Sequence, residues 1–436
     1  MLYEKEVEKM KTLIKNATLI PMNENKKRIE QDIDILIEDD EITKIEKNIK
    51  DNVDKTIDAS KRIVLPGLIN THSHVPMSIF RETIDDLSLK DWLTKKIWPM
   101  EDKLTDEDIY YASLLSFIEM IKTGCTTIND MYFKADSIIK AQRKTGIRLQ
   151  TSRCLMSING DEEAKNRLVE LKELYEKYKD DNMLSFNIGI HGLYTSDTKY
   201  VKECLALAKE LDLPIHMHFC ENKEEVDDII KIHGKTPVEV LKKNFKGFHT
   251  ILAHSVKLTK EDLKKIKDMD IHVSTCPISN LKLGCGIAPI TEMKELSINI
   301  SLGTDGQGSG CNLDLFEVMK FVSLLQKGIK EDPTVINSYD VLKMATINGA
   351  KALGLDKEIG SIEIGKKADM IILNLDEITL KPTNDLISEI VYNANGHNVE
   401  TTIINGNILM ENKKLTFDIN ESEIMNKCDT IINRIK

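Results

Sequence analysis

The sequence predicts an α/β protein in which a TIM-type (β/α)8 barrel is joined to a small β-sandwich built by both ends of the chain. From residue 63 onward, short apolar runs rich in β-branched residues alternate with longer segments of helical periodicity, which is typical of repeated βα units. Before residue 63 and near the end of the chain, apolar and polar residues alternate instead. We therefore expect sandwich segments at 1–62 and 359–436, with the barrel at 63–358.

Eight runs are expected to form the strands of the barrel. They span residues 63–74, 125–131, 147–155, 184–192, 213–221, 249–255, 271–277 and 298–305. In the segments between them, such as 106–122 and 199–211, apolar residues recur at intervals of three and four, as on amphipathic helices. Eight strand and helix units in succession favour a closed parallel barrel.

The two ends of the chain carry the pattern that the sandwich requires. Residues 34–38 and 42–45 alternate apolar and polar positions with turn residues between them, which indicates a hairpin. Residues 369–373 and 401–406 repeat this style in the tail. Since neither end makes a convincing domain alone, we expect the two ends to pair into one small sandwich beside the barrel.

Composition and charge limit the partners of the protein. Among its 436 residues, 71 are acidic and 60 are Lys or Arg, and a net charge of -11 argues against a general affinity for nucleic acid or anionic membranes. The eight cysteines show no paired spacing, the first residues lack a signal-peptide pattern, and no run reaches the roughly 20 apolar residues of a membrane span. We expect a cytoplasmic protein with a small-molecule partner; assembly into a homo-oligomer stays open.

Histidines and carboxylates gather at the predicted C-terminal strand ends, where such barrels place their chemistry. They are His72 and His74 on the first strand, His191 on the fourth, His218 and Glu221 on the fifth, His254 on the sixth and Asp305 on the eighth. The first two are one residue apart, so on a strand they point the same way, although an isolated pair would equally suit a loop. Three imidazoles and one carboxylate are a usual ligand set for a catalytic zinc or a similar divalent ion.

From residues 66–74 to residues 365–369, the chain resembles the metal-dependent amidohydrolase superfamily. The resemblance implies four ligands, which are His72, His74, His218 and Asp305. Strand four offers His191 where members with two metal ions present a bridging lysine. The resemblance therefore implies one divalent ion per subunit, and zinc is the ion that we expect.

Several segments resemble more specifically the 5-methylthioadenosine/S-adenosylhomocysteine deaminases. These segments are 77–81, 87–93 leading to 98–101, 130–133 and 279–284. The resemblance implies that Glu101 binds the ribose hydroxyls and that Arg153 lies near the 5' substituent. It also implies that His191 and Glu221 contact the purine and that Trp92 walls the same pocket.

The implied reaction is hydrolytic deamination of adenosine-type nucleosides with release of ammonia. It converts 5-methylthioadenosine to 5-methylthioinosine and S-adenosylhomocysteine to S-inosylhomocysteine, with 5'-deoxyadenosine and adenosine as further candidates. A divalent ion can lower the pKa of water to roughly 7, which supplies hydroxide for attack on C6. Asp305 is expected to accept the proton of that water, Glu221 to protonate N1, and His254 to orient the water. A closed apolar pocket would raise the pKa of Glu221 enough for this role.

Two other functions compete with this hypothesis. A guanine deaminase, or a triazine deaminase or chlorohydrolase, would use the same scaffold, but residues 92–101 speak against it because a free base has no ribose to bind. A non-catalytic assembly protein of this fold would not need four ligands and two acid/base groups. Three details stay open: the preferred 5' substituent, the part played by His216, and whether Arg167 replaces a second arginine of the family.

Overall fold

The structure is a computed structural model that describes residues 10–23 and 28–436. Its barrel is built from two parallel sheets of four and five strands. The first sheet contains β6 (Leu68–Ser73), β7 (Cys125–Tyr132), β8 (Arg148–Arg153) and β9 (Leu184–Phe186). The second contains β10 (Ile188–Gly192), β11 (Ile215–Phe219), β12 (Thr250–His254), β13 (Ile271–Thr275) and β14 (Asn299–Leu302).

Backbone contacts join the two sheets into one closed wall. At one seam Leu155 forms a parallel bridge with Ile190. At the other seam the N–H of Asp305 donates to the carbonyl of His72 over 3.1 Å, so the residues after β14 lie against β6. The predicted barrel is therefore confirmed, and the C-terminal ends of its strands meet at one rim.

Two of the predicted strands are divided. The run at 63–74 becomes β5 (Ile63–Pro66) and β6, and only β6 belongs to the barrel. A Cβ atom at Gly67 would lie 2.1 Å from the side chain of Thr126, so glycine is required where the chain passes this close. The run at 184–192 breaks at Asn187, whose side chain donates to Asn129 over 2.8 Å.

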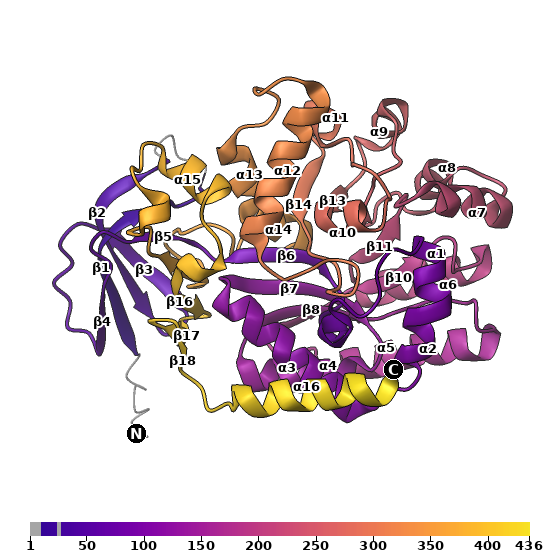
Figure 1. Ribbon diagram of the computed structural model, residues 1–436, viewed down its shortest axis with the longest axis horizontal. Helices are drawn as coiled ribbons and strands as arrows, with labels where there is room; N and C mark the ends of the chain where they lie inside the picture. Colours follow the sequence, from indigo (N-terminus) through magenta and orange to yellow (C-terminus); the bar gives the residue numbers. More distant parts are fainter. Residues whose placement is uncertain (1–9, 24–27) are drawn as a thin grey trace, which may run out of the picture.

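Helices surround the barrel and cover the outer faces of its strands (Figure 1). The loop after β6 holds η1 (Val75–Phe80), α1 (Leu89–Trp92), η2 (Leu93–Ile97) and α2 (Trp98–Glu101). The other elements around the barrel are α3 (Asp106–Lys122), α4 (Ala135–Thr145), α5 (Asp161–Tyr178), α6 (Thr198–Leu211), α7 (Lys223–His233), α8 (Pro237–Asn244), α9 (Lys260–Ile266), α10 (Pro277–Lys282), α11 (Ile290–Glu295), α12 (Leu315–Lys330), α13 (Ser338–Met344) and α14 (Ile347–Leu353). Side chains such as Thr105, Asp197 and Asn222 cap the first N–H groups of α3, α6 and α7, which fixes where these helices begin.

Both ends of the chain form one mixed sheet of nine strands beside the barrel. The N-terminal strands are β1 (Lys11–Leu19), β2 (Glu30–Glu38), β3 (Glu41–Glu46), β4 (Lys55–Asp58) and β5. The C-terminal strands are β15 (Met370–Leu373), β16 (Val399–Ile404), β17 (Asn407–Glu411) and β18 (Lys414–Leu415). Because β5 pairs with both β1 and β15, it joins the two ends, and residues of β2 and β15 share one apolar core. The expected small β domain from both ends is confirmed.

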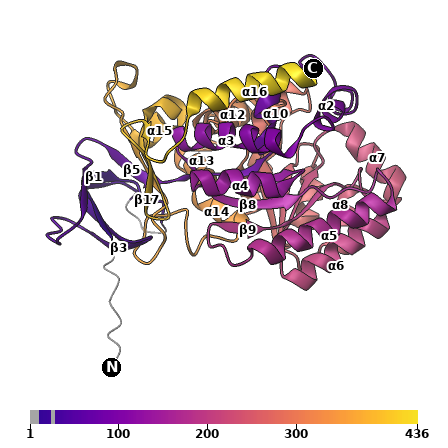
Figure 2. The same ribbon diagram turned by 90° about the horizontal axis from the view of Figure 1, so that it is seen from below.

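The tail returns from this sheet to the barrel. It contains η3 (Ile378–Leu380), α15 (Leu386–Tyr392), η4 (Gly396–Asn398) and α16 (Glu421–Ile435). Helix α16 lies along α3 in both views (Figures 1 and 2), and ion pairs such as Lys122 with Glu421 and Arg434 with Asp108 hold it there. Among residues 10–23 and 28–436, no helix combines the length and apolar character needed to cross a membrane.

Candidate metal and active site

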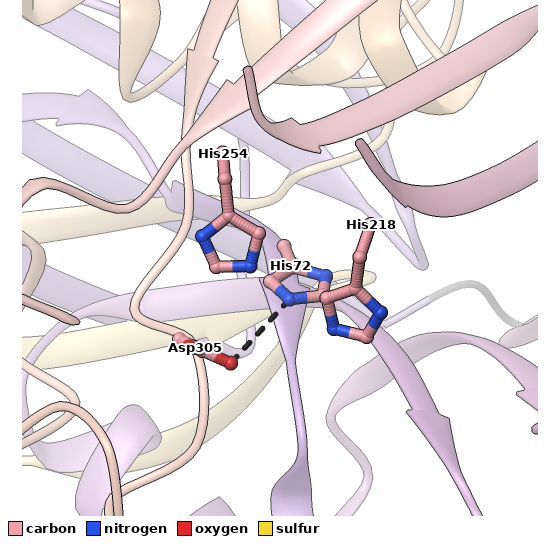
Figure 3. Close-up of side chains that lie close together, drawn as sticks. All are labelled: His72, His218, His254 and Asp305. Carbon is pink, nitrogen blue, oxygen red and sulfur yellow. Dashed lines mark ion pairs between the residues drawn. The ribbon is translucent and has the colours of Figure 1, made fainter. Parts of the chain in front are cut away.

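The predicted metal ligands meet at the C-terminal rim of the barrel. His72 lies on β6, His74 follows that strand, His218 lies on β11 and Asp305 follows β14. His254 ends β12 beside them (Figure 3). One ligand atom each from His72, His218, His254 and Asp305 falls within 4.8 Å of the others, and all four residues are buried. This is a buried site able to hold a metal ion.

The spacing of the side-chain atoms suits a tetrahedral ion. Oδ1 of Asp305 lies 3.4 Å from Nε2 of His72 and 3.2 Å from Nε2 of His74. Nε2 of His74 lies 3.1 Å from Nε2 of His218. Bonds of about 2.0–2.2 Å to a tetrahedral zinc place neighbouring ligand atoms roughly 3.3 Å apart, so these three distances match that geometry. Nε2 of His72 is buried without a hydrogen-bond partner in the described part of the chain, as a metal-facing lone pair would be.

Hydrogen bonds behind the imidazoles fix which nitrogen faces the site. Nδ1 of His74 lies 2.7 Å from the carbonyl of Met131, and Nδ1 of His218 lies 2.5 Å from the carbonyl of His191. Because a carbonyl only accepts, each Nδ1 carries a proton, and each Nε2 is the nitrogen that faces the centre. Nδ1 of His72 lies 2.8 Å from Nε2 of His216, which therefore supports a ligand from behind.

Two hydroxyl groups orient Asp305. Ser279 and Ser309 donate to its Oδ2 over 2.6 and 2.8 Å, which leaves Oδ1 facing His72 and His74. Burial favours the neutral acid, but the close imidazoles of His72 and His74 hold the pKa of Asp305 well below its usual range. Asp305 is therefore an anion at neutral pH. Burial lowers the pKa of His72 to about 4, which keeps that imidazole neutral and able to bind a metal.

The backbone is strained around the site. His254, Asp305 and Cys220 adopt positive φ values of 68°, 61° and 51°, in the left-handed region that residues with side chains rarely occupy. Such conformations cost of order 1–3 kcal/mol each and concentrate at functional sites. Here they turn the chain at the strand ends, so that the polar side chains face one another.

Glu221 lies at the edge of this group and is almost fully buried. Its Oε2 is 3.8 Å from Nε2 of His254, and the thiol of Cys285 lies 3.7 Å from its Oε1. Burial raises the pKa of Glu221, as an acid that acts at neutral pH requires. Nδ1 of His254 donates to Oδ1 of Asn280 over 2.8 Å, so its Nε2 is available to the cavity.

Most of the predicted substrate residues line one inner cavity with the metal-binding side chains. Its walls contain Trp92, Glu101, His191 and Glu221 together with His74, His218, His254 and Asp305. Glu101 accepts a hydrogen bond from the hydroxyl of Tyr132, and burial raises the pKa of Glu101 to about 7. Trp92 and Glu101 come from the loop after β6, and the other residues lie at or just after the ends of several strands, so the fold brings them together around one space.

Arg153 stands apart from this inner group. It lines a larger outer cavity of about 790 Å³, together with Arg167. Four residues, Trp98, Glu101, Tyr132 and Phe133, line both cavities, so the two spaces adjoin. The structure thus places Arg153 next to the inner site but not within it.

Several residues that orient the side chains of the site were not predicted from the sequence. Tyr132, Ser279 and Asn280 lie in segments that carried the family resemblance, which was the signal available for them. Ser309 and Glu225 had no such signal. The buried carboxylate of Glu225 accepts the backbone N–H groups of Cys220 and Glu221 over 2.9 and 2.6 Å, which fixes the turn that carries Glu221.

A second group, His249, Asp270 and His272, lies at the opposite ends of the strands. Nδ2 of Asn299 donates to the carbonyl of Asn348 and also lies 2.9 Å from Nδ1 of His272. Nε2 of His272 must then carry its proton and donate it to Asp270 over 3.0 Å. These hydrogen bonds already use the ligand atom of His272, so we interpret this group as a structural network.

Comparison with known proteins agrees with this geometry. Residues 63–409 match the model of the amidohydrolase family. A 5-methylthioadenosine/S-adenosylhomocysteine deaminase from Thermoanaerobacter pseudethanolicus is 44% identical over 415 residues, which cover 94% of this chain and 96% of the relative. A 5'-deoxyadenosine deaminase from Methanobrevibacter smithii is 42% identical over 407 residues, covering 92% and 93%. The crystal structure of an adenosine deaminase from Xanthomonas campestris with bound zinc superposes with a TM-score of 0.92 at 28% identity, covering 98% of both chains.

Proposed function

This chain belongs to the amidohydrolase family, and on that premise we propose that it hydrolytically deaminates adenosine-type nucleosides. The substrates are 5-methylthioadenosine and S-adenosylhomocysteine, with 5'-deoxyadenosine and adenosine as further candidates. The observation that carries the proposal is the inner cavity. There a carboxylate suited to ribose hydroxyls, Glu101, and a carboxyl group suited to protonating a purine, Glu221, share one space with the metal-binding histidines.

We further propose that one divalent ion, zinc, is held by His72, His74, His218 and Asp305. His74 is preferred to His254 as the fourth ligand because its Nε2 lies 3.1–3.2 Å from two other ligand atoms. Nε2 of His254 has no hydrogen-bond partner among the described residues, and Oε2 of Glu221 lies 3.8 Å from it. When bound, such an ion supplies a nucleophile by lowering the pKa of water to roughly 7.

The side chains of the site supply the proton transfers of the reaction. Asp305, an anion at neutral pH, accepts the proton of the attacking water and passes it to the departing amine. Glu221 donates a proton to N1 as C6 becomes tetrahedral. As ammonia leaves and the C6 hydroxyl becomes the oxo group, the proton of that hydroxyl returns to Glu221. His254, held by Asn280, orients the water through its Nε2. Water is consumed, and the 6-oxopurine and ammonia are the products.

Substrate binding is assigned to the walls of the two cavities. Glu101 accepts hydrogen bonds from the ribose hydroxyls, and Trp92 packs beside the nucleoside. Burial lowers the pKa of His191 to about 3, so a neutral imidazole faces the purine. Arg153, in the outer cavity, lies beyond Glu101 and contacts the 5' substituent.

Three wider proposals accompany this assignment. The barrel at 63–358 is the catalytic domain, and segments 1–62 and 359–436 form the β domain beside it. The compartment is the cytoplasm, which suits eight cysteines that are all free thiols. A purine nucleoside is the partner.

The test is a substrate panel. Zinc-loaded protein is incubated with 5-methylthioadenosine, S-adenosylhomocysteine, 5'-deoxyadenosine, adenosine and guanine, while ammonia and the purine ultraviolet spectrum are followed. We expect release of ammonia from the nucleosides and none from guanine. Activity on guanine alone would overturn the proposal in favour of a free-base deaminase.

A further inference from the structure

Two buried arginines lie side by side in the outer cavity. The side chains of Arg153 and Arg167 are 12% and 4% exposed. Both guanidinium groups lie over the ring of Phe133, at 5.2 and 5.5 Å from its centre, and both donate to the carbonyl of Cys154, over 3.1 and 3.3 Å. Two positive charges thus share one aromatic ring and one carbonyl oxygen, a placement that requires nearby anions.

The anions come from helix α5. Glu170 accepts from Nε of Arg153 over 2.5 Å, and Glu163 pairs with Arg167. In contrast to the arginines, the side chains of these glutamates are 51% and 45% exposed, so they meet the buried cations from the solvent side. Nε of Arg167 is buried without a hydrogen-bond partner among the residues that the structure describes. The donor capacity of the pair is therefore only partly used.

The outer cavity is where a 5' substituent would extend. Glu101, assigned to the ribose, lines the inner and the outer cavity, as does Phe133 beneath both guanidinium groups. A group attached to C5' of the ribose therefore passes from Glu101 towards Arg153 and Arg167. There it meets cations that already have carboxylate partners.

We propose that Glu163 and Glu170 are specificity-determining residues that compete with anionic 5' substituents for Arg167 and Arg153. The proposal rests on the function proposed above. An uncharged substituent leaves both ion pairs intact, so the buried cations stay compensated. A carboxylate on the substituent competes with the glutamates for the arginines, and the glutamates can rotate into water at small cost because they are half exposed. The two glutamates thereby reduce the advantage of an anionic substrate over a neutral one.

The test compares two probes that differ in charge. 5-Methylthioadenosine is uncharged at the 5' end, and 5'-S-(3-carboxypropyl)-5'-thioadenosine is S-adenosylhomocysteine without its amino group, so it carries the carboxylate alone. We expect Glu170→Gln and the double variant Glu163→Gln/Glu170→Gln to raise the ratio of kcat/KM for the carboxylate probe to that for 5-methylthioadenosine. The expected rise for the double variant is roughly five- to thirtyfold, which corresponds to about 1–2 kcal/mol.

Two further variants on α5 separate competition from general charge effects. Glu162→Gln removes an exposed charge away from the cavity and serves as the matched control. Glu173→Gln removes a charge from the lining of the same cavity, and no ion pair of Glu173 with either arginine is found among the described residues. An unchanged or lowered ratio in Glu170→Gln, or an equal rise in Glu173→Gln, would overturn the proposal.

The single Glu170→Gln variant keeps the test available if the double variant is too unstable, because Glu170 is half exposed.

Failure of the proposed function would give a different result from failure of the present inference. The wild-type protein would then deaminate none of the nucleosides, whereas failure of the present inference leaves a working deaminase whose ratio does not respond to Glu163 and Glu170.

Discussion

At the scale of single residues, Glu221 is the strongest candidate for the group that protonates the purine. Its burial, its raised pKa and its place beside His254 all suit a carboxyl group that donates a proton during the reaction. Its sequence position before α7 would also suit a solvated charge at the start of a helix. That interpretation does not agree with a side chain that is 4% exposed. The remaining question is how much of the rate depends on it.

We predict that Glu221→Gln lowers kcat by roughly 100- to 10,000-fold, because positioned proton transfer typically contributes this much. Metal content should be unchanged, since the ligands and their supporting hydrogen bonds remain. Steady-state kinetics and elemental analysis measure the two. Glu224→Gln is the matched control, because Glu224 is exposed and pairs with Lys90. Wild-type turnover in Glu221→Gln would show that the acid is another group.

Glu101 gives a prediction about pH. Burial raises its pKa to about 7, so the carboxylate takes up a proton as the pH falls through that value. The neutral acid is a poorer acceptor for two ribose hydroxyls. We therefore expect KM for 5-methylthioadenosine to rise below about pH 7 while kcat changes less, and Glu101→Gln to have a high KM that no longer depends on pH. A constant wild-type KM from pH 6 to 8 would contradict this role.

At the scale of elements, the turn from β11 to α7 determines where Glu221 points. Cys220 is held in the left-handed region, and Glu225 on α7 accepts its N–H and that of Glu221. The hydrogen bonds therefore offset the cost of the strained turn. Although Glu225 is not among the residues that line the inner cavity, the turn depends on it.

We predict that Glu225→Ala lowers kcat about tenfold or more with a smaller effect on KM, because displacement of a catalytic group by even 1 Å can cost ~100-fold. Two buried N–H groups would lose their acceptor, at about 1–3 kcal/mol each, so the free energy of unfolding should fall as well. Kinetics and denaturant titration measure these effects, with Glu224→Ala as the control. Loss of stability with unchanged kcat would make Glu225 a purely structural residue.

The order of the elements followed from the sequence, whereas their exact ends did not. Periodicity predicts a strand from residue 63, but it does not show that the chain leaves the terminal sheet at Gly67, where it passes close to Thr126, and enters the barrel. Similarly, the break at Asn187 depends on a hydrogen bond to Asn129, 58 residues away in the sequence. Contacts of this kind are set by packing, which local patterns do not contain.

The same division applies to the candidate site. Alternation on β6 and the strand-end rule predict that the histidines and Asp305 gather at one rim, because both depend on local geometry. The choice of His72, His74, His218 and Asp305 as ligands came from the family resemblance. The neighbours that orient them, such as Ser309, come from loops, and their positions depend on the whole fold. The ion pairs of Arg153 and Arg167 likewise needed the structure, since residue type alone does not show which carboxylate compensates which cation.

At the scale of the whole molecule, the proposed metal site joins the two sheets of the barrel. His72 belongs to the sheet that begins with β6, and His218 belongs to the sheet that contains β11. Asp305 follows β14 at the seam where that sheet meets β6 again. Without a cation, the site gathers three imidazoles and a buried carboxylate whose lone pairs face one another. An ion there would therefore stabilise the closed barrel as well as serve catalysis.

We predict that chelation of the metal abolishes deamination and lowers the melting temperature, and that zinc restores both. An ion that binds only the folded state stabilises it by about 4 kcal/mol when its free concentration is 1,000 times its Kd. Calorimetry with and without zinc measures the shift. His218→Ala should show the low melting temperature and no response to zinc, whereas His397→Ala, which changes an exposed residue of η4 in the tail, should respond like wild type. The site is built by ligands from β6, β11 and the loop after β14, so loss of one ligand must weaken it. A full zinc response in His218→Ala would therefore show that the ion acts elsewhere.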